Sequence, residues 1–261
     1  MGVNTLLEKK DGLAIVTLNR PDIANAFTTE MFNEVAEVFE KLGRDTDVRV
    51  VLLKANGKLF SGGGDIKMFN EILQTKEPLS MELCLSPGRM VQAVRNCLKP
   101  VVVAVQGAAA GAGFGLALAC DYRVVTESSK LVPAFNGIGL SGDSGLIYFL
   151  GKNLGPAKAY ELITQQPFIT SNQATDLSLV NKVVKDEELE KEALYFAEKL
   201  LAQPTKVLER QKDMLNRTFY SDLADVNLRE AVNIHQSSKD EDFFEAVSAF
   251  LEKRKAEFKG K

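Results

Sequence analysis

The chain has 261 residues, of which 45% are hydrophobic and 26% charged, a balance typical of a globular protein with a sizeable core. Its formal net charge of −3 offers no broad positive field, so we expect no nucleic-acid partner. Three cysteines without CxxC spacing argue against a disulfide framework or a zinc site, and one histidine argues against a His-based triad. No signal peptide or membrane span is evident near the N-terminus, so a cytoplasmic protein without a membrane partner is expected.

The first two-thirds of the chain alternate apolar runs rich in β-branched residues with segments of helical periodicity, which predicts an α/β fold. In chain order the predicted elements are a strand over 12–18, a helix capped by Thr28 or Thr29, a strand over 48–53, a helix over about 87–98, and strands over 101–105 and 122–125.

The last part of the chain has a helical pattern over 187–202, 204–217, 221–238 and 239–256. We therefore expect an α/β core over 1–200 and a helical C-terminal region over 201–261. The final helix carries more apolar side chains than one face can bury, which predicts an oligomer built from trimers. These side chains are Phe243, Phe244, Val247, Phe250 and Leu251.

Two loops rich in small residues each lead into a predicted helix: 60–66 (FSGGGDI) and 105–115 (VQGAAAGAGFG). Neither has the context of a dinucleotide-binding fingerprint, and neither contains the GK[ST] of a P-loop. Small residues let a ligand approach the backbone, and a helix start exposes N–H groups that favour negative charge. One N–H from each loop could form an oxyanion hole. Close packing of helix against strand is the alternative explanation for each loop alone.

Together with their surroundings, these loops resemble the crotonase (enoyl-CoA hydratase/isomerase) superfamily over nearly the whole chain. The matching segments are 18–21 (LNRP) with 25–27 (NAF), 60–67 (FSGGGDIK), 99–100 (KP) with 104–107 (AVQG), 110–113 (AGAG), 119–123 (ACDYR), 138–140 (IGL) and the apolar and basic positions of 243–254. The resemblance implies a ββα spiral core, a helical C-terminal trimerisation region, and a homotrimer or hexamer. It also implies an acyl-CoA or acyl-carrier-protein thioester as substrate in fatty acid metabolism, with no separate cofactor and no metal.

The same resemblance assigns roles to individual residues. The oxyanion-hole amides would be those of Gly64 and Ala112. Phe250 and Lys253, on the last helix of one subunit, would complete the CoA site of a neighbour. The remaining residues expected to contact the CoA or acyl part of the substrate are Ala24, Ala26, Gly62, Gly63, Asp65, Ile66, Gly111, Phe135 and Leu140.

The choice of chemistry depends on the carboxylates. Relatives that add water carry two glutamates, where this chain has Gly115 and Phe135, so an ordinary hydratase is disfavoured. Asp143 stands where several isomerase branches of the superfamily carry their catalytic acid. One base suffices to move a double bond from the β,γ to the α,β position, and apolar surroundings should raise its pKa toward neutral.

We therefore expect a Δ3,Δ2-type enoyl-CoA or enoyl-ACP isomerase. The alternatives are a hydratase or lyase that uses a water held by Asp143, and a non-catalytic homologue that only binds acyl-CoA. Asp143 could also merely cap the next helix. Asp65 and Asp121 are more simply explained as a helix cap and as a backbone anchor at a strand start.

Overall fold

A six-stranded β-sheet with the strand order β1-β2-β3-β4-β6-β9 forms the centre of the computed structural model, which describes residues 4–165 and 167–261 without the side chains of 66 and 67. Its strands are β1 (Thr5–Lys10), β2 (Leu13–Leu18), β3 (Val50–Ala55), β4 (Val101–Val105), β6 (Tyr122–Thr126) and β9 (Lys182–Val184). β1 pairs with β2 in antiparallel fashion, and the other pairs are parallel. The central strand β4 (VVVAV) is buried throughout, as parallel strands covered on both faces usually are.

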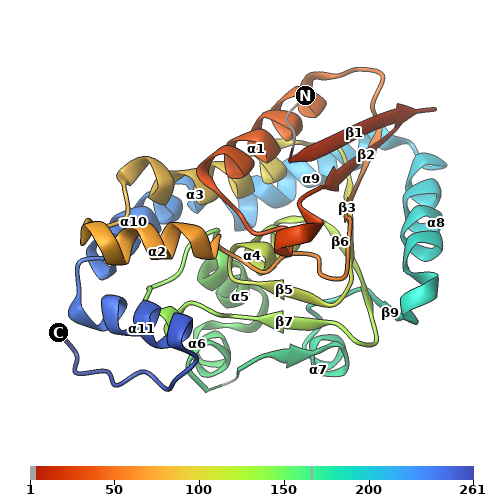
Figure 1. Ribbon diagram of the computed structural model, residues 1–261. Coiled ribbons are helices and arrows are strands. Elements are labelled where there is room, and N and C mark those ends of the chain that lie inside the picture. The colour runs from red at the N-terminus through yellow and green to blue at the C-terminus, as the bar shows by residue number, and fades with distance from the viewer. Residues whose placement is uncertain (1–3, 166) are drawn as a thin grey trace.

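A second sheet of three short strands lies beside the first: β5 (Ala108–Ala110), β7 (Lys130–Val132) and β8 (Ile169–Thr170), in the order β5-β7-β8. The chain repeats a unit of two strands and one helix, in which the two strands belong to different sheets. β4 joins the large sheet, β5 the small one, and α4 (Ala112–Ala119) comes next; β6, β7 and α5 (Leu146–Leu154) repeat the pattern. This repetition is the ββα spiral that the resemblance implied, and the ribbon shows β5 and β7 running side by side (Figure 1).

Helices surround the two sheets (Figure 1). Thr28 caps α1 (Thr29–Arg44) by accepting the Met31 N–H, as predicted, and Ser80 caps α3 (Met81–Asn96) by accepting the Leu83 N–H. The predicted start of α3 near residue 87 is wrong, because the capped helix begins six residues earlier and continues through Pro87. The remaining α-helices are α2 (Ile66–Thr75), α6 (Pro156–Gln165), α7 (Ser171–Asp176), α8 (Leu189–Leu201), α9 (Thr205–Phe219), α10 (Leu223–Ser237) and α11 (Glu241–Glu252).

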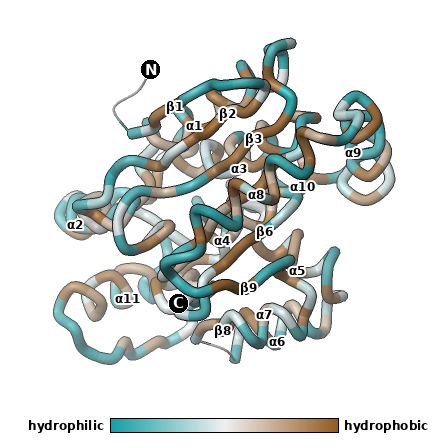
Figure 2. The backbone as a smooth tube through the Cα atoms, turned by 90° about the vertical axis from the view of Figure 1, so that its right-hand side faces the viewer, coloured by the Kyte–Doolittle hydropathy of each residue, from teal (hydrophilic) through white to brown (hydrophobic). Residues whose placement is uncertain are grey.

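The large sheet divides the apolar interior into two clusters. Val50, Leu52 and Val102 face α8, whose Ala193 and Ala197 are fully buried against them. The other face of the sheet carries the larger cluster, which includes residues of α1, α3, α4 and α10. Figure 2 shows the apolar residues of β3 and β6 running through the centre of the chain. Burial of this apolar surface is the main driving force for folding.

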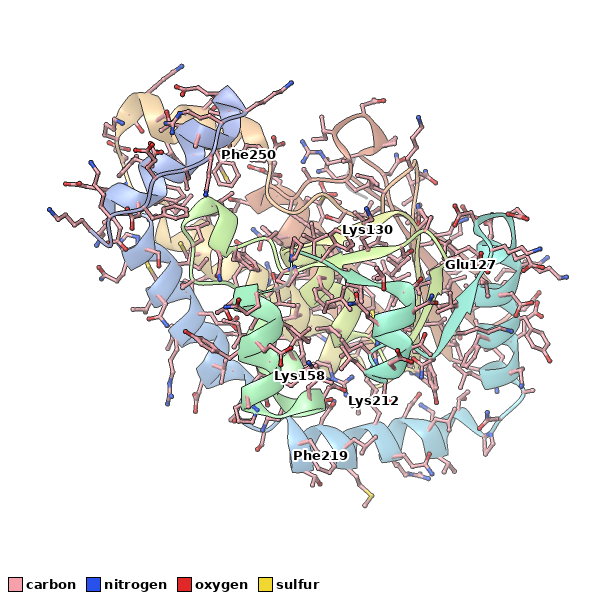
Figure 3. The ribbon with its side chains drawn as sticks, turned by 90° about the horizontal axis from the view of Figure 1, so that it is seen from below. Glu127, Lys130, Lys158, Lys212, Phe219 and Phe250 are labelled. Atoms are coloured by element: carbon pink, nitrogen blue, oxygen red, sulfur yellow. The ribbon has the colours of Figure 1, made fainter. Side chains whose placement is uncertain are left out.

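The C-terminal helices follow one another around the outside of this core (Figure 3). On α11, Phe243 and Val247 are buried within their own chain, so they are not surplus apolar side chains as the sequence pattern suggested. On α11 itself Phe250 is half exposed, and a larger group of exposed apolar side chains lies on α9 and α10. They include Met214, Leu215, Phe219 (52% exposed, on the outer side of α9 in Figure 3), Leu228 and Val232.

Among the described residues, no helix is both long and apolar enough to cross a membrane.

Candidate active site

The two glycine loops lie side by side at the centre of the site. Ser61 and Ala109 form a parallel bridge, in which the Ser61 N–H donates to the Ala108 carbonyl at 3.0 Å and the Ala110 N–H donates to the Ser61 carbonyl at 2.9 Å. Gly64 and Ala112 each follow three residues after a member of that bridge. The two predicted oxyanion-hole residues therefore lie at equal distances in sequence from the point where the loops pair.

Small residues are required because the loops approach so closely. A Cβ on Gly113 would lie 2.5 Å from the Ser61 Cβ, well inside normal van der Waals contact. Gly63 has a φ of +93°, and a Cβ there would lie 3.2 Å from the Ala110 carbonyl oxygen. Close packing, one of the two explanations for these loops, is therefore present, and it leaves room for the other, an oxyanion hole.

The Gly64 and Ala112 amides have no hydrogen-bond partner within the described part of the chain. The Ala112 amide belongs to the first turn of α4, where helix amides lack intrahelical acceptors and the helix dipole favours a negative charge. Around Gly64, the Phe27 N–H donates to the Gly63 carbonyl and the Asp65 N–H donates to the Phe27 carbonyl. These bonds hold the segment and leave the Gly64 N–H available to a ligand.

Gly64 and Ala112 both line a cavity of about 580 Å³, a volume in the range of small-molecule sites. Ile66 is the first residue of α2, and its side chain lies outside the described part of the structure. Lys253 ends α11 in the left-handed conformation, is exposed, and is not among the cavity-lining residues. The other predicted site residues all line the cavity: Asp143, Gly64, Ala112, Ala24, Ala26, Gly62, Gly63, Asp65, Gly111, Phe135, Leu140 and Phe250.

Phe250 contributes to the cavity of its own chain, although 49% of its surface remains exposed. The resemblance implied a contribution to a neighbouring subunit instead. Figure 3 shows Phe250 on the side of α11 that faces the rest of the chain.

Asp143 faces the cavity from the loop before α5. Burial raises the pKa of Asp143 to about 6, although the Ser144 hydroxyl donates to its Oδ1 at 2.7 Å and acts in the opposite direction. The helix-cap alternative is wrong: the N-cap of α5 is Gly145, and no side chain caps this helix. Asp143 is thus a carboxyl group with a near-neutral pKa that is accessible from the cavity.

The surroundings of Gly115 leave no space for a second acidic side chain at that position. A Cβ at Gly115 would lie 2.5 Å from the Ser144 carbonyl oxygen and 2.6 Å from the Ser144 Cβ. The loop that presents Asp143 therefore fills the space that a side chain at position 115 would need. With the loop in this position, a glutamate at position 115 would clash with Ser144.

The other two acidic residues near the loops have structural partners. Asp65 forms an ion pair with Arg20 at 3.2 Å, directly before α2. Asp121 accepts the Val101 N–H at 2.9 Å, which anchors the start of β4 as predicted. Lys212 and Arg95 lie 2.7 and 2.8 Å from the Asp121 carboxylate, and their positive charges hold its pKa below the ordinary value against the effect of burial.

The sequence analysis missed the apolar wall of the cavity and a second buried carboxyl group near Asp143. The carboxyl group is Glu230 of α10. A helical pattern marks such residues as core positions without showing which distant loop they contact. The additional apolar lining residues are Phe27, Phe32, Met68, Phe69, Leu79, Leu83, Cys84, Pro87, Ile138 and Ile234.

Within the described residues, no three His, Cys, Asp or Glu side chains are grouped as metal ligands would be.

Comparison with known proteins gives consistent results. The family model described as enoyl-CoA hydratase/isomerase matches residues 8–261. The chain is 34% identical to 1,2-epoxyphenylacetyl-CoA isomerase of Escherichia coli and 27% identical to trans-2-decenoyl-[acyl-carrier-protein] isomerase of Streptococcus mutans, with 96% of each chain covered in both cases. Among solved structures, an enoyl-CoA hydratase from Mycobacterium avium subsp. paratuberculosis matches with a TM-score of 0.88 and 29% identity, covering 98% of this chain and 99% of that one.

Proposed function

Since the chain belongs to the enoyl-CoA hydratase/isomerase family, we propose that it is a Δ3,Δ2-type enoyl thioester isomerase in which Asp143 is the single proton shuttle. The observation that carries the proposal is the cavity-facing Asp143 with its pKa near 6, together with the lack of space for a side chain at Gly115. An ordinary hydratase of this family needs two carboxylates, and the second has no room here.

In the proposed reaction, the Asp143 carboxylate removes a proton from C2 of a 3-enoyl thioester. The electrons move into a dienolate whose oxygen accepts hydrogen bonds from the Gly64 and Ala112 amides. Asp143, now protonated, returns the proton to C4 and leaves the conjugated 2-enoyl thioester. Donors held in place before the charge develops are an effective way to stabilise such an intermediate.

A pKa near 6 suits this shuttle. At neutral pH the group is mainly ionised and can accept a proton, yet it is a much stronger base than an ordinary carboxylate. The apolar walls around the acyl chain, with Leu83 and Ile234, would limit access of water to the dienolate.

Product analysis in D₂O tests the assignment. The purified protein is given a 3-enoyl-CoA and, separately, a 2-enoyl-CoA, and the products are followed by absorbance and mass spectrometry. We expect the 3-enoyl thioester to become conjugated and the 2-enoyl thioester to gain no water. Rapid formation of a 3-hydroxyacyl thioester would instead support the hydratase with an Asp143-held water. Binding without either reaction would support a non-catalytic homologue.

The carrier and the assembly belong to the same proposal. We expect CoA thioesters to be substrates, with the adenine end near Ala24 and Ala26. Rates with the same acyl group on CoA and on an acyl carrier protein show which carrier the protein prefers.

We also propose that the protein is a homotrimer or a dimer of trimers in the cytoplasm. The exposed apolar side chains of α9 and α10 support the oligomer. No cofactor or metal enters the proposed reaction.

A further inference from the structure

Glu230 is a buried carboxyl group that has no role in the proposed reaction. It lies on α10 with 8% of its surface exposed. Its Oε2 accepts the Gly145 N–H at 2.8 Å, while its Oε1 is buried and has no hydrogen-bond partner among the described residues. Burial of a carboxyl group with only one of its oxygens hydrogen-bonded costs free energy.

The bond from Gly145 acts directly on the loop that carries Asp143. Ser144 is fully buried with a φ of +57°, an unfavourable conformation for a residue with a side chain, and Gly145 has a φ of +64°. The Ser144 hydroxyl in turn donates to Asp143. Glu230 therefore anchors a strained turn whose geometry sets the direction of the Asp143 carboxylate.

The two carboxyl groups also interact through their charges. Burial, and to a lesser extent the charge of Asp143, raise the pKa of Glu230 to about 8, although the Gly145 amide acts in the opposite direction. Asp143, with a pKa near 6, ionises first. The elements around Glu230 carry other titratable or charged side chains, but only the charge of Asp143 contributes to the raised pKa of Glu230. These side chains are Glu82, Cys84, Arg89 and Arg95 on α3, Tyr148 and Lys152 on α5, and Asp225, Arg229 and His235 on α10.

We propose that Glu230 is a positioning residue that holds the Asp143 loop in its active geometry while uncharged and that inhibits the isomerase when it ionises. The proposal rests on the isomerase function assigned to Asp143. An uncharged carboxyl group can still accept the Gly145 N–H through its carbonyl oxygen. Once ionised, it adds a second negative charge close to Asp143, which opposes formation of the anionic dienolate in a site of low dielectric.

The test compares pH–rate profiles of the wild type, Glu230→Gln and Glu230→Ala. For the wild type we expect the rate to rise through about pH 6 as Asp143 ionises and to fall through about pH 8 as Glu230 ionises. Glu230→Gln keeps an acceptor for Gly145 but cannot ionise, so it should retain kcat at pH 7 and lose the alkaline fall. Glu230→Ala loses the anchor, so kcat should fall by as much as about 10²-fold with little change in KM.

Asp225→Asn is the matched control, because Asp225 is exposed on the same helix. It should leave the whole profile unchanged. Infrared spectroscopy provides a readout independent of turnover: the C=O stretch of a protonated carboxylic acid at pH 7 should disappear in Glu230→Gln. If Glu230→Ala fails to fold, the Gln profile and the infrared band still decide the question.

The proposal is overturned if Glu230→Gln keeps the alkaline fall, if the infrared band is unaffected, or if a folded Glu230→Ala keeps wild-type kcat. Failure of the isomerase assignment has a different signature, because Asp143→Asn would then keep its rate. An inactive Asp143→Asn combined with an unchanged Glu230→Gln profile would refute the role of Glu230 alone.

Discussion

Replacing Asp143 by asparagine removes the proposed base while keeping the shape of the side chain. The amide oxygen can still accept the bond that the Ser144 hydroxyl donates at 2.7 Å, so the loop should remain in place. Loss of a general base typically lowers a rate by about 10²–10⁴-fold, which is roughly 3–5 kcal/mol of transition-state stabilisation. Affinity for an unreactive acyl-CoA should change little, because in the proposed complex the thioester oxygen is held by the Gly64 and Ala112 amides and not by Asp143.

The same substitution should stabilise the folded protein at neutral pH. Burial raises the pKa of Asp143 from its ordinary value of 3.8 to about 6, so the folded state binds its proton more tightly than the unfolded state does. Stability is therefore lost as pH rises from about 4 to 6, and a shift of this size corresponds to roughly 3 kcal/mol. Asparagine does not ionise. Its advantage over wild type should be near that value at pH 8 and should fade below pH 4.

Conversion of a 3-enoyl-CoA is followed by the absorbance of the conjugated product, and stability by urea unfolding at pH 4 and pH 8. Asp176→Asn is a suitable control, because Asp176 is exposed at the end of α7 and its replacement should alter neither quantity. An Asp143→Asn enzyme that keeps most of its kcat would refute the shuttle. Equal pH dependence of stability in variant and wild type would refute the argument from burial.

Other substitutions test the packing and the assembly. Gly115→Ala places a methyl group 2.5 Å from a backbone oxygen and should lower the free energy of unfolding by about 1–3 kcal/mol. The control Gly151→Ala has open space at its Cβ and should be neutral or stabilising. Equal effects of the two substitutions in thermal unfolding would contradict the steric argument. Lys212→Met removes one of the positive charges that hold Asp121 and should cost up to about 3–5 kcal/mol in urea unfolding, so a near-neutral result would show that the pair is dispensable. Light scattering at micromolar concentration should give the mass of a trimer or a multiple of it, and Met214→Glu should reduce that mass; a monomeric wild type would rule out the assembly.

Local patterns in the sequence were sufficient to predict the elements that depend on nearby residues. The strand over 101–105 is β4, and the helix capped by Thr28 is α1, because apolar periodicity and capping act within a few residues. The prediction that Asp143 has a raised pKa also depended on the apolar residues expected around it, and the structure confirms the direction.

The tertiary structure decided what depends on contacts between distant segments. β1 is an edge strand with mostly solvated side chains, so its pattern gave no signal, and the alanines of β5 form a strand because β7 and Ser61 pair with them. Glu230 reaches Gly145 across 85 positions of sequence. The periodicity of a helix shows which face is buried, but only the packed chain determines which loop that face meets, and so which carboxyl group stands beside Asp143.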